Sequence, residues 1–114
     1  METCDPFDLV VVPLPFTDRE SAKRRPALVL SGADFHADTG HLVLAMVTTA
    51  ARSRWRSDVT VRDWRAAGLP YPSVVRMKIF TLDGRFILRK LGSLTARDRK
   101  QAAASLAGVL RAIQ

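Results

Sequence analysis

The stretch Arg24-Arg25-Pro26-Ala27-Leu28-Val29-Leu30-Ser31-Gly32 decides the fold more than any other part of this 114-residue chain. Its apolar residues, Pro26 to Leu30, form a short continuous run, which is typical of a strand buried on both faces. Proline suits the start of a strand because it has no N–H to donate. Ser31-Gly32 closes the run. We therefore expect a buried strand over 26–30, preceded by a polar loop over 17–25.

Further strands are indicated on both sides of this one. They are expected over 9–12, 41–49, 57–61, 73–82 and 85–91. The run at 9–12 is β-branched and is ended by Pro13 and Pro15. Asp83-Gly84 predicts a two-residue hairpin between the last two strands. Residues 62–67 indicate one or two helical turns, stopped by Gly68 and Pro70.

The C-terminal segment differs in kind, because its apolar residues recur at helical spacing. Thr95 can cap a helix that runs to the C-terminus, with one apolar face formed by Ala102, Leu106, Val109, Leu110 and Ile113. Several short strands followed by one closing helix predict a single α+β domain over 1–114, built as a small barrel or curled sheet. Periodicity does not decide the barrel's topology.

Composition bounds the class of protein. Hydrophobic residues make up 47% of the chain and charged residues 25%, as in an ordinary soluble domain. Eighteen Lys+Arg against eleven Asp+Glu give a net charge of +7, which favours a polyanionic partner or simply aids solubility. Cys4 is the single cysteine and has no reactive signature around it. No signal peptide or membrane-spanning run is visible, so we expect a cytoplasmic protein.

Most familiar kinds of enzyme site find no support in the sequence. One cysteine with His36 and His41 does not make a zinc ligand set, and no Gly-rich phosphate loop or G-x-S-x-G motif occurs. We expect neither a metal nor a cofactor. The two histidines are interpreted as a loop residue and a strand-starting residue.

Basic residues gather in three places. They are the loop after the first strand (Arg19, Lys23, Arg24, Arg25), the loop after 41–49 (Arg52, Arg54, Arg56) and alternate positions of the 73–82 strand (Arg76, Lys78). Basic side chains bind phosphates, and an aromatic between them can stack on an unpaired base. Each cluster alone is explained equally well as a solvated surface, and Trp55 and Trp64 as packing or dimer contacts. Three clusters on adjacent strands could form one groove.

The order of these motifs resembles the MazF/PemK toxin family over about residues 8–110. Arg25-Pro26 with the following apolar run and Ser31 is similar to the family's "RP-hydrophobic-S" strand, and Met46-Val47-Thr48-Thr49 to its "hydrophobic-T-S/T" strand end. Other matching stretches are Asp8-Leu9-Val10, Pro13 to Asp18, Ser73 to Arg76, Lys78 to Leu82 and Lys90 to Leu94.

The resemblance implies an SH3-like β-barrel with a C-terminal helix, working as a homodimer. It implies metal-free, ribosome-independent cleavage of single-stranded RNA at a preferred short sequence, with messenger RNA as the expected substrate, and neutralisation by a cognate antitoxin. The family's catalytic arginine falls on Arg25 and its catalytic threonine on Thr48. RNA-binding positions would be Thr17, Arg19, Lys23, Arg24, Arg52, Arg54, Arg76 and Lys78.

Three questions stay open at the level of sequence. The general base is unassigned, because Lys78 stands where some relatives carry an acid; Asp18 and Glu20 are alternative loop carboxylates. A protein-binding toxin of the CcdB type on the same barrel is one rival function. A barrel that binds nucleic acid without cutting it is another, since fold does not fix function.

Overall fold

The computed structural model describes residues 3–14, 23–50 and 54–111. The strands are β1 (Asp8–Leu14), β2 (Lys23–Val29), β3 (His41–Thr49), β4 (Val59–Thr60), β5 (Ser73–Asp83) and β6 (Arg89–Ser93). The helices are α1 (Ala33–Thr39), the 3-10 turn η1 (Gly84–Phe86) and α2 (Ala96–Val109). No helix within these residues is both long and apolar enough to cross a bilayer.

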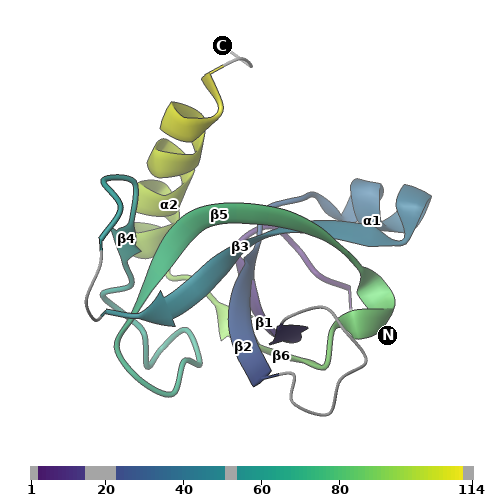
Figure 1. The fold of residues 1–114 in the computed structure, drawn as a ribbon, viewed down its shortest axis with the longest axis horizontal. Helices are drawn as coiled ribbons and strands as arrows, with labels where there is room; N and C mark the ends of the chain where they lie inside the picture. Colours follow the sequence, from purple (N-terminus) through teal and green to yellow (C-terminus); the bar gives the residue numbers. More distant parts are fainter. Residues whose placement is uncertain (1–2, 15–22, 51–53, 112–114) are drawn as a thin grey trace.

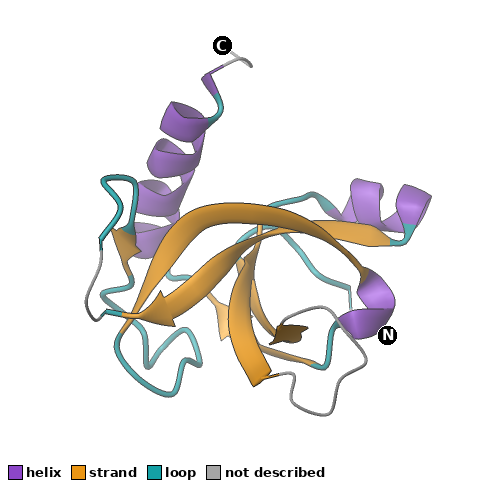
Figure 2. Cartoon of the chain, in the orientation of Figure 1, coloured by secondary structure: helices purple, strands orange, loops and turns teal. Residues whose placement is uncertain are grey.

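The described strands form one antiparallel sheet in the order β4-β5-β3-β2-β1-β6. Figure 1 shows this sheet curled over on itself, with α2 beside one end and α1 at the other. The curled strands make up the body of the molecule, and the helices lie outside it (Figure 2). The expectation of an α+β, curled barrel-like domain with a C-terminal helix is confirmed.

Two hydrophobic cores lie on opposite faces of the sheet, because successive side chains of a strand alternate between its faces. Leu28 belongs to the core beneath α2, which also holds Leu9, Ala45, Val47, Val75, Met77 and Ala102. Its neighbours Ala27 and Val29 belong to the other core, with Val10, Val12, Leu42, Leu44 and Leu82. Of the buried strand predicted over 26–30, residues 26–29 are buried in β2, whereas Leu30 lies just beyond the strand and is half-buried.

The strand carrying Arg25 begins earlier than expected. The loop predicted over 17–25 was wrong in part, because Lys23 to Arg25 pair with β1 as far as Leu14↔Lys23. On its other side β2 pairs with β3 only from Ala27 to Val29. Pro26 stands where that second pairing stops and has no N–H to extend it. Figure 1 shows the Lys23 end of β2 and the Thr49 end of β3 lying apart.

Local signals were misinterpreted at four other places. Helix α1 was not predicted, and the strand over 57–61 shrinks to Val59–Thr60. The one or two helical turns expected over 62–67 are present as hydrogen-bonded turns, with the Ala67 N–H donating to the Asp63 carbonyl at 3.0 Å, but they form no regular helix. The hairpin at Asp83-Gly84 is instead the 3-10 turn η1, where the Asp83 carboxylate accepts the Arg85 N–H at 2.9 Å. The strand expected over 85–91 therefore starts only at Arg89.

Helix α2 is anchored near its N-terminus by a buried carboxylate. Asp98 is 1% exposed and accepts the backbone N–H groups of Arg62 at 3.1 Å and Asp63 at 2.8 Å. Thr95 is the N-cap residue, but its hydroxyl donates to Asp63 at 2.6 Å and makes no cap hydrogen bond. Farther along, Ala102 is buried, whereas Val109 and Leu110 are exposed. The predicted apolar face is thus covered only in its first half, and Ile113 lies outside the described residues.

Candidate active site

The register of the strands brings Arg25 and Thr48 to one face of the sheet. The β2–β3 pairs Ala27↔Met46 and Val29↔Leu44 are antiparallel, and continuing this register by two residues sets Arg25 opposite Thr48. Directly opposite residues of an antiparallel pair point to the same side. Both side chains are half-buried, and no hydrogen bond joins them. Their side chains therefore lie on the same face of the sheet, just beyond the point at which the pairing of β2 with β3 stops.

The same row continues over the next two strands. Thr48 pairs with Val74 of β5, and Val74 pairs with Thr60 of β4. Thr60 is exposed, while Val74 is buried. Across the strands, the row thus runs from the Arg25 guanidinium to the Thr48 hydroxyl, the apolar Val74 and the Thr60 hydroxyl. This is a chemistry suited to gripping phosphate oxygens and sugar hydroxyls.

A second group of side chains on the same face lies two residues farther along the strands, around Arg76. Met46 pairs with Arg76, whose guanidinium makes two bonds to Asp58, from Nε to Oδ1 at 3.1 Å and from Nη2 to Oδ2 at 2.8 Å. The exposed Trp55 ring lies over the same guanidinium, 5.3 Å from Cζ to the ring centroid. The backbone N–H of Trp55 also donates to Asp58 at 3.0 Å.

Because of these contacts, Arg76 is not a simple unpaired cation available to a phosphate. The hydrogen bonds from Arg76 hold the pKa of Asp58 below its ordinary value, and the carboxylate in turn raises the pKa of Arg76. Arg76 is thus held in one orientation, with its charge balanced by Asp58. Spacing along the strand predicts Arg76 as an RNA-binding residue, but Asp58 was missed, since nothing local in the sequence links it to a residue 18 positions away.

The other predicted RNA-binding residues are placed as follows. Lys23 and Arg24 are exposed at the start of β2. Arg54 is exposed, and its charge adds a smaller part to the lowering of the Asp58 pKa by Arg76. Lys78 is exposed within a bulge of β5, between the pairs Met46↔Arg76 and Ala45↔Ile79. Thr17, Arg19 and Arg52 lie outside the described residues, as do the candidate carboxylates Asp18 and Glu20.

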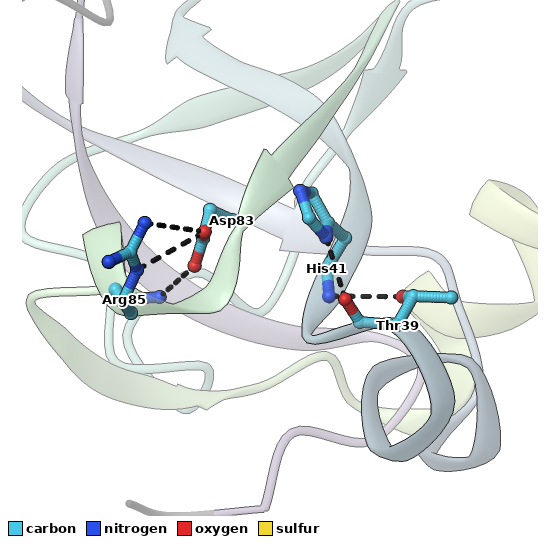
Figure 3. A network of polar contacts seen from close by, with 4 residues as sticks. All are labelled: Thr39, His41, Asp83 and Arg85. Atoms are coloured by element: carbon cyan, nitrogen blue, oxygen red, sulfur yellow. Dashed lines mark hydrogen bonds and ion pairs between the residues drawn. The ribbon is translucent and has the colours of Figure 1, made fainter.

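The histidines lie at the opposite end of the sheet. His41 begins β3, seven residues and about 23 Å from Thr48 at ~3.3 Å per residue. Figure 3 shows His41 bound to Thr39, with its backbone N–H donating to the Thr39 hydroxyl at 3.1 Å, beside the Asp83–Arg85 pair. His36 lies in α1 near Gly84. Neither imidazole can reach Arg25 or Thr48 within one chain.

The comparison that decides the family is a match over nearly the whole chain. The model of a family described as "PemK-like, MazF-like toxin of type II toxin-antitoxin system" matches residues 5–110. The chain belongs to this family. The MazF/PemK assignment agrees with the order of motifs along β1, β2, β3 and β5.

Solved structures of MazF proteins share the fold. MazF in a MazE–MazF crystal structure from Deinococcus radiodurans (Form-III) is 26% identical, with a TM-score of 0.76 over 96% of this chain and 98% of that one. MazF alone from the same organism (Form-I) is 27% identical, with a TM-score of 0.75 over 97% and 99%. A mycobacterial "endoribonuclease in complex with its cognate antitoxin", 19% identical, shows the fold alone, with a TM-score of 0.75 over 97% and 96%. Among curated proteins, none matches the chain.

Proposed function

We propose that this MazF/PemK-family protein is an endoribonuclease that cleaves single-stranded RNA without a metal, as the toxin of a toxin–antitoxin pair. The observation that supports the proposal most is the β2–β3 register, which, continued by two residues beyond its last pair, sets Arg25 opposite Thr48 on one face of the sheet. A phosphodiester placed between them would meet a fixed positive charge on one side and a hydroxyl on the other.

The proposed reaction uses the 2′-OH of the RNA as its nucleophile. The 2′-oxygen attacks the adjacent phosphorus, the bond from phosphorus to the 5′-oxygen breaks, and the products are a 2′,3′-cyclic phosphate and a 5′-hydroxyl. A proton leaves the 2′-OH, and one is delivered to the 5′-oxygen. In this scheme Arg25 grips the phosphate oxygens with its planar fork and stabilises the charge that develops on them. Thr48 donates to the phosphate or accepts from the 2′-OH.

None of the described groups near Arg25 and Thr48 is a good general base for the 2′-OH proton. Asp58 is a poor base, because hydrogen bonds from Arg76 and the Trp55 amide occupy its oxygens and lower its pKa. Both histidines lie at the far end of β3. An arginine side chain is in general a poor proton acceptor. Asp18 and Glu20 remain the candidates for this role.

The partners follow from the same proposal. An antitoxin with an acidic segment would suit a chain of net charge +7. Complexes named MazE–MazF occur among the structural relatives, which supports a protein partner for this chain too. We further propose a homodimer that cleaves messenger RNA in the cytoplasm at a preferred sequence.

Substitutions at Arg25 and Thr48 test the proposal. We expect Arg25→Ala to lower kcat by about 10²–10³-fold, the range found when one preorganised group that stabilises transition-state charge is removed. Arg25→Lys should recover little, because a lysine lacks the planar fork. Thr48→Val removes the hydroxyl at nearly constant shape, whereas Thr48→Ser keeps it and should retain most activity. Gyrase inhibition that survives Arg25→Ala would favour a protein-binding toxin, and RNA binding without product would favour a non-catalytic barrel.

A further inference from the structure

A groove on the other face of β2 contains cationic, aromatic and apolar side chains together. It has a volume of about 400 Å³, and Arg24, Arg25, Pro26, Tyr71 and Arg89 are among its lining residues. We call it the Tyr71 groove. Pockets of a few hundred Å³ accommodate small ligands, and this one has room for about one nucleotide.

The sheet register explains why these side chains meet. Val11 of β1 pairs with Pro26 of β2 on one side and with Arg89 of β6 on the other, so all three lie on one face. Arg24 is two residues before Pro26 and shares that face. Pro26 and Arg89 are two strand spacings apart, about 10 Å. Arginine side chains from both sides can therefore reach one ligand lying over Val11.

The opposite wall is held in place by a close backbone approach. Gly68 has φ +89°, and a Cβ atom there would lie 2.3 Å from the Leu91 carbonyl oxygen. Tyr71 follows shortly after, between Pro70 and Pro72, whose rings restrict the backbone on both sides. Its side chain is 38% exposed. The backbone that carries Tyr71 is thus restricted beside the arginines.

The charge of the groove is not balanced by acids within the described part of the chain. Arg76, Arg85 and Arg97 each pair with an aspartate there. No hydrogen bond or ion pair to another described residue involves the side chains of Arg24, Arg25 or Arg89. None of the groove's described lining residues is acidic. The groove therefore offers the guanidinium groups of Arg24 and Arg89 to an anion.

We propose that the Tyr71 groove binds one nucleotide of the RNA next to the cleaved bond, with its base stacked on Tyr71 and its phosphates held by Arg24 and Arg89. This inference rests on the proposed ribonuclease function. Arg25, whose side chain belongs to the catalytic row, is also one of the residues that line the groove, so an RNA strand bound at Arg25 can continue into the groove. Stacking on an exposed aromatic beside arginines is the usual way in which unpaired bases are bound.

The test is binding of single-stranded RNA in which 2′-fluoro replaces every 2′-OH, so that no nucleophile for cleavage is present. Fluorescence anisotropy should show that Tyr71→Ala weakens binding about tenfold, whereas Tyr71→Phe, which keeps the ring, changes it less than twofold. Arg89→Gln should reduce the slope of log affinity against log salt by about 0.7, the value for removing one phosphate interaction from a single strand. Arg111→Gln, just beyond α2, is the matched control and should lower that slope by clearly less.

The outcomes separate this inference from the proposed function. Wild-type protein that binds the 2′-fluoro RNA but never cleaves natural RNA would refute the ribonuclease and leave the groove supported. Cleavage with groove variants that bind like wild type would overturn the groove alone. Two other results would also overturn it: a change of oligomeric state in Tyr71→Ala, which indicates an interface between copies, or a loss of binding only to an acidic antitoxin peptide.

Discussion

Replacement of Gly92 by alanine tests how the Tyr71 groove and the barrel are held together. A Cβ atom at Gly92 would lie 2.3 Å from the carbonyl oxygen of Ala67 and 2.9 Å from its carbon, both backbone atoms that cannot rotate away. An ordinary van der Waals separation needs about 1 Å more, so β6 or the 67–68 segment must move by that amount. Overpacking in a tight region usually costs about 1–3 kcal/mol. We expect Gly92→Ala to lower the free energy of unfolding by ~3 kcal/mol, the upper end of this range, because the opposing atoms belong to the backbone.

Urea unfolding measures the effect directly. With a slope of ~1.5 kcal/mol per molar, a loss of ~3 kcal/mol lowers the midpoint by about 2 M. The matched control is Gly108→Ala, because a Cβ there meets nothing within 4 Å and the residue lies in α2. That variant should gain about 0.5–1 kcal/mol from helix propensity. Equal midpoints for Gly92→Ala and wild type would show that the close approach does not constrain the fold.

Three further predictions concern the carboxylates. Asp98→Ala leaves two backbone N–H groups without their acceptor and should lower the unfolding free energy by about 2–4 kcal/mol in the same urea assay; a loss under about 1 kcal/mol would show that α2 is anchored otherwise. Burial raises the pKa of Asp8, but hydrogen bonds from Ser93 and the Asp5 amide, together with Lys90, lower it below its ordinary value. Hydrogen bonds from Arg76 likewise lower the pKa of Asp58. Their stabilisation is present above pH ~4 and is lost as pH falls through the lowered pKa values, so stability followed from about pH 5 to about pH 2 should drop below pH ~4. Asp58→Asn should flatten part of that drop and tighten RNA binding at neutral pH by removing one negative charge; an unchanged pH profile would contradict the ion pair.

Much of the fold could be predicted because the strands bury both faces. The continuous apolar runs at 26–29 and 42–47 are visible in the sequence as soon as burial on two sides is considered. Helix α1 could not be predicted in the same way, since none of its residues is buried and it has no apolar stripe. Asp83-Gly84 was misinterpreted, because the Asp83 carboxylate caps a 3-10 turn where the dipeptide alone suggests a hairpin.

The candidate site, too, could be predicted from the sequence only in part. Arg25 and Thr48 were predicted as catalytic residues from the family resemblance, and the strand register explains why two residues 23 positions apart can share one face. The Asp58 partner of Arg76 and the Tyr71 groove depend on pairing between distant segments. Their residues follow no local spacing, so only the three-dimensional structure reveals them.

The central claim is that RNA supplies its own nucleophile and that Arg25 supplies the charge. The most direct measurement is incubation of purified protein with end-labelled single-stranded RNA in excess EDTA, with analysis of the product ends. We predict cleavage that leaves 2′,3′-cyclic phosphate and 5′-hydroxyl ends, and its loss by about two orders of magnitude or more in a folded Arg25→Ala variant. Cleavage that appears only after a divalent metal is added, or that persists in Arg25→Ala, would contradict the claim.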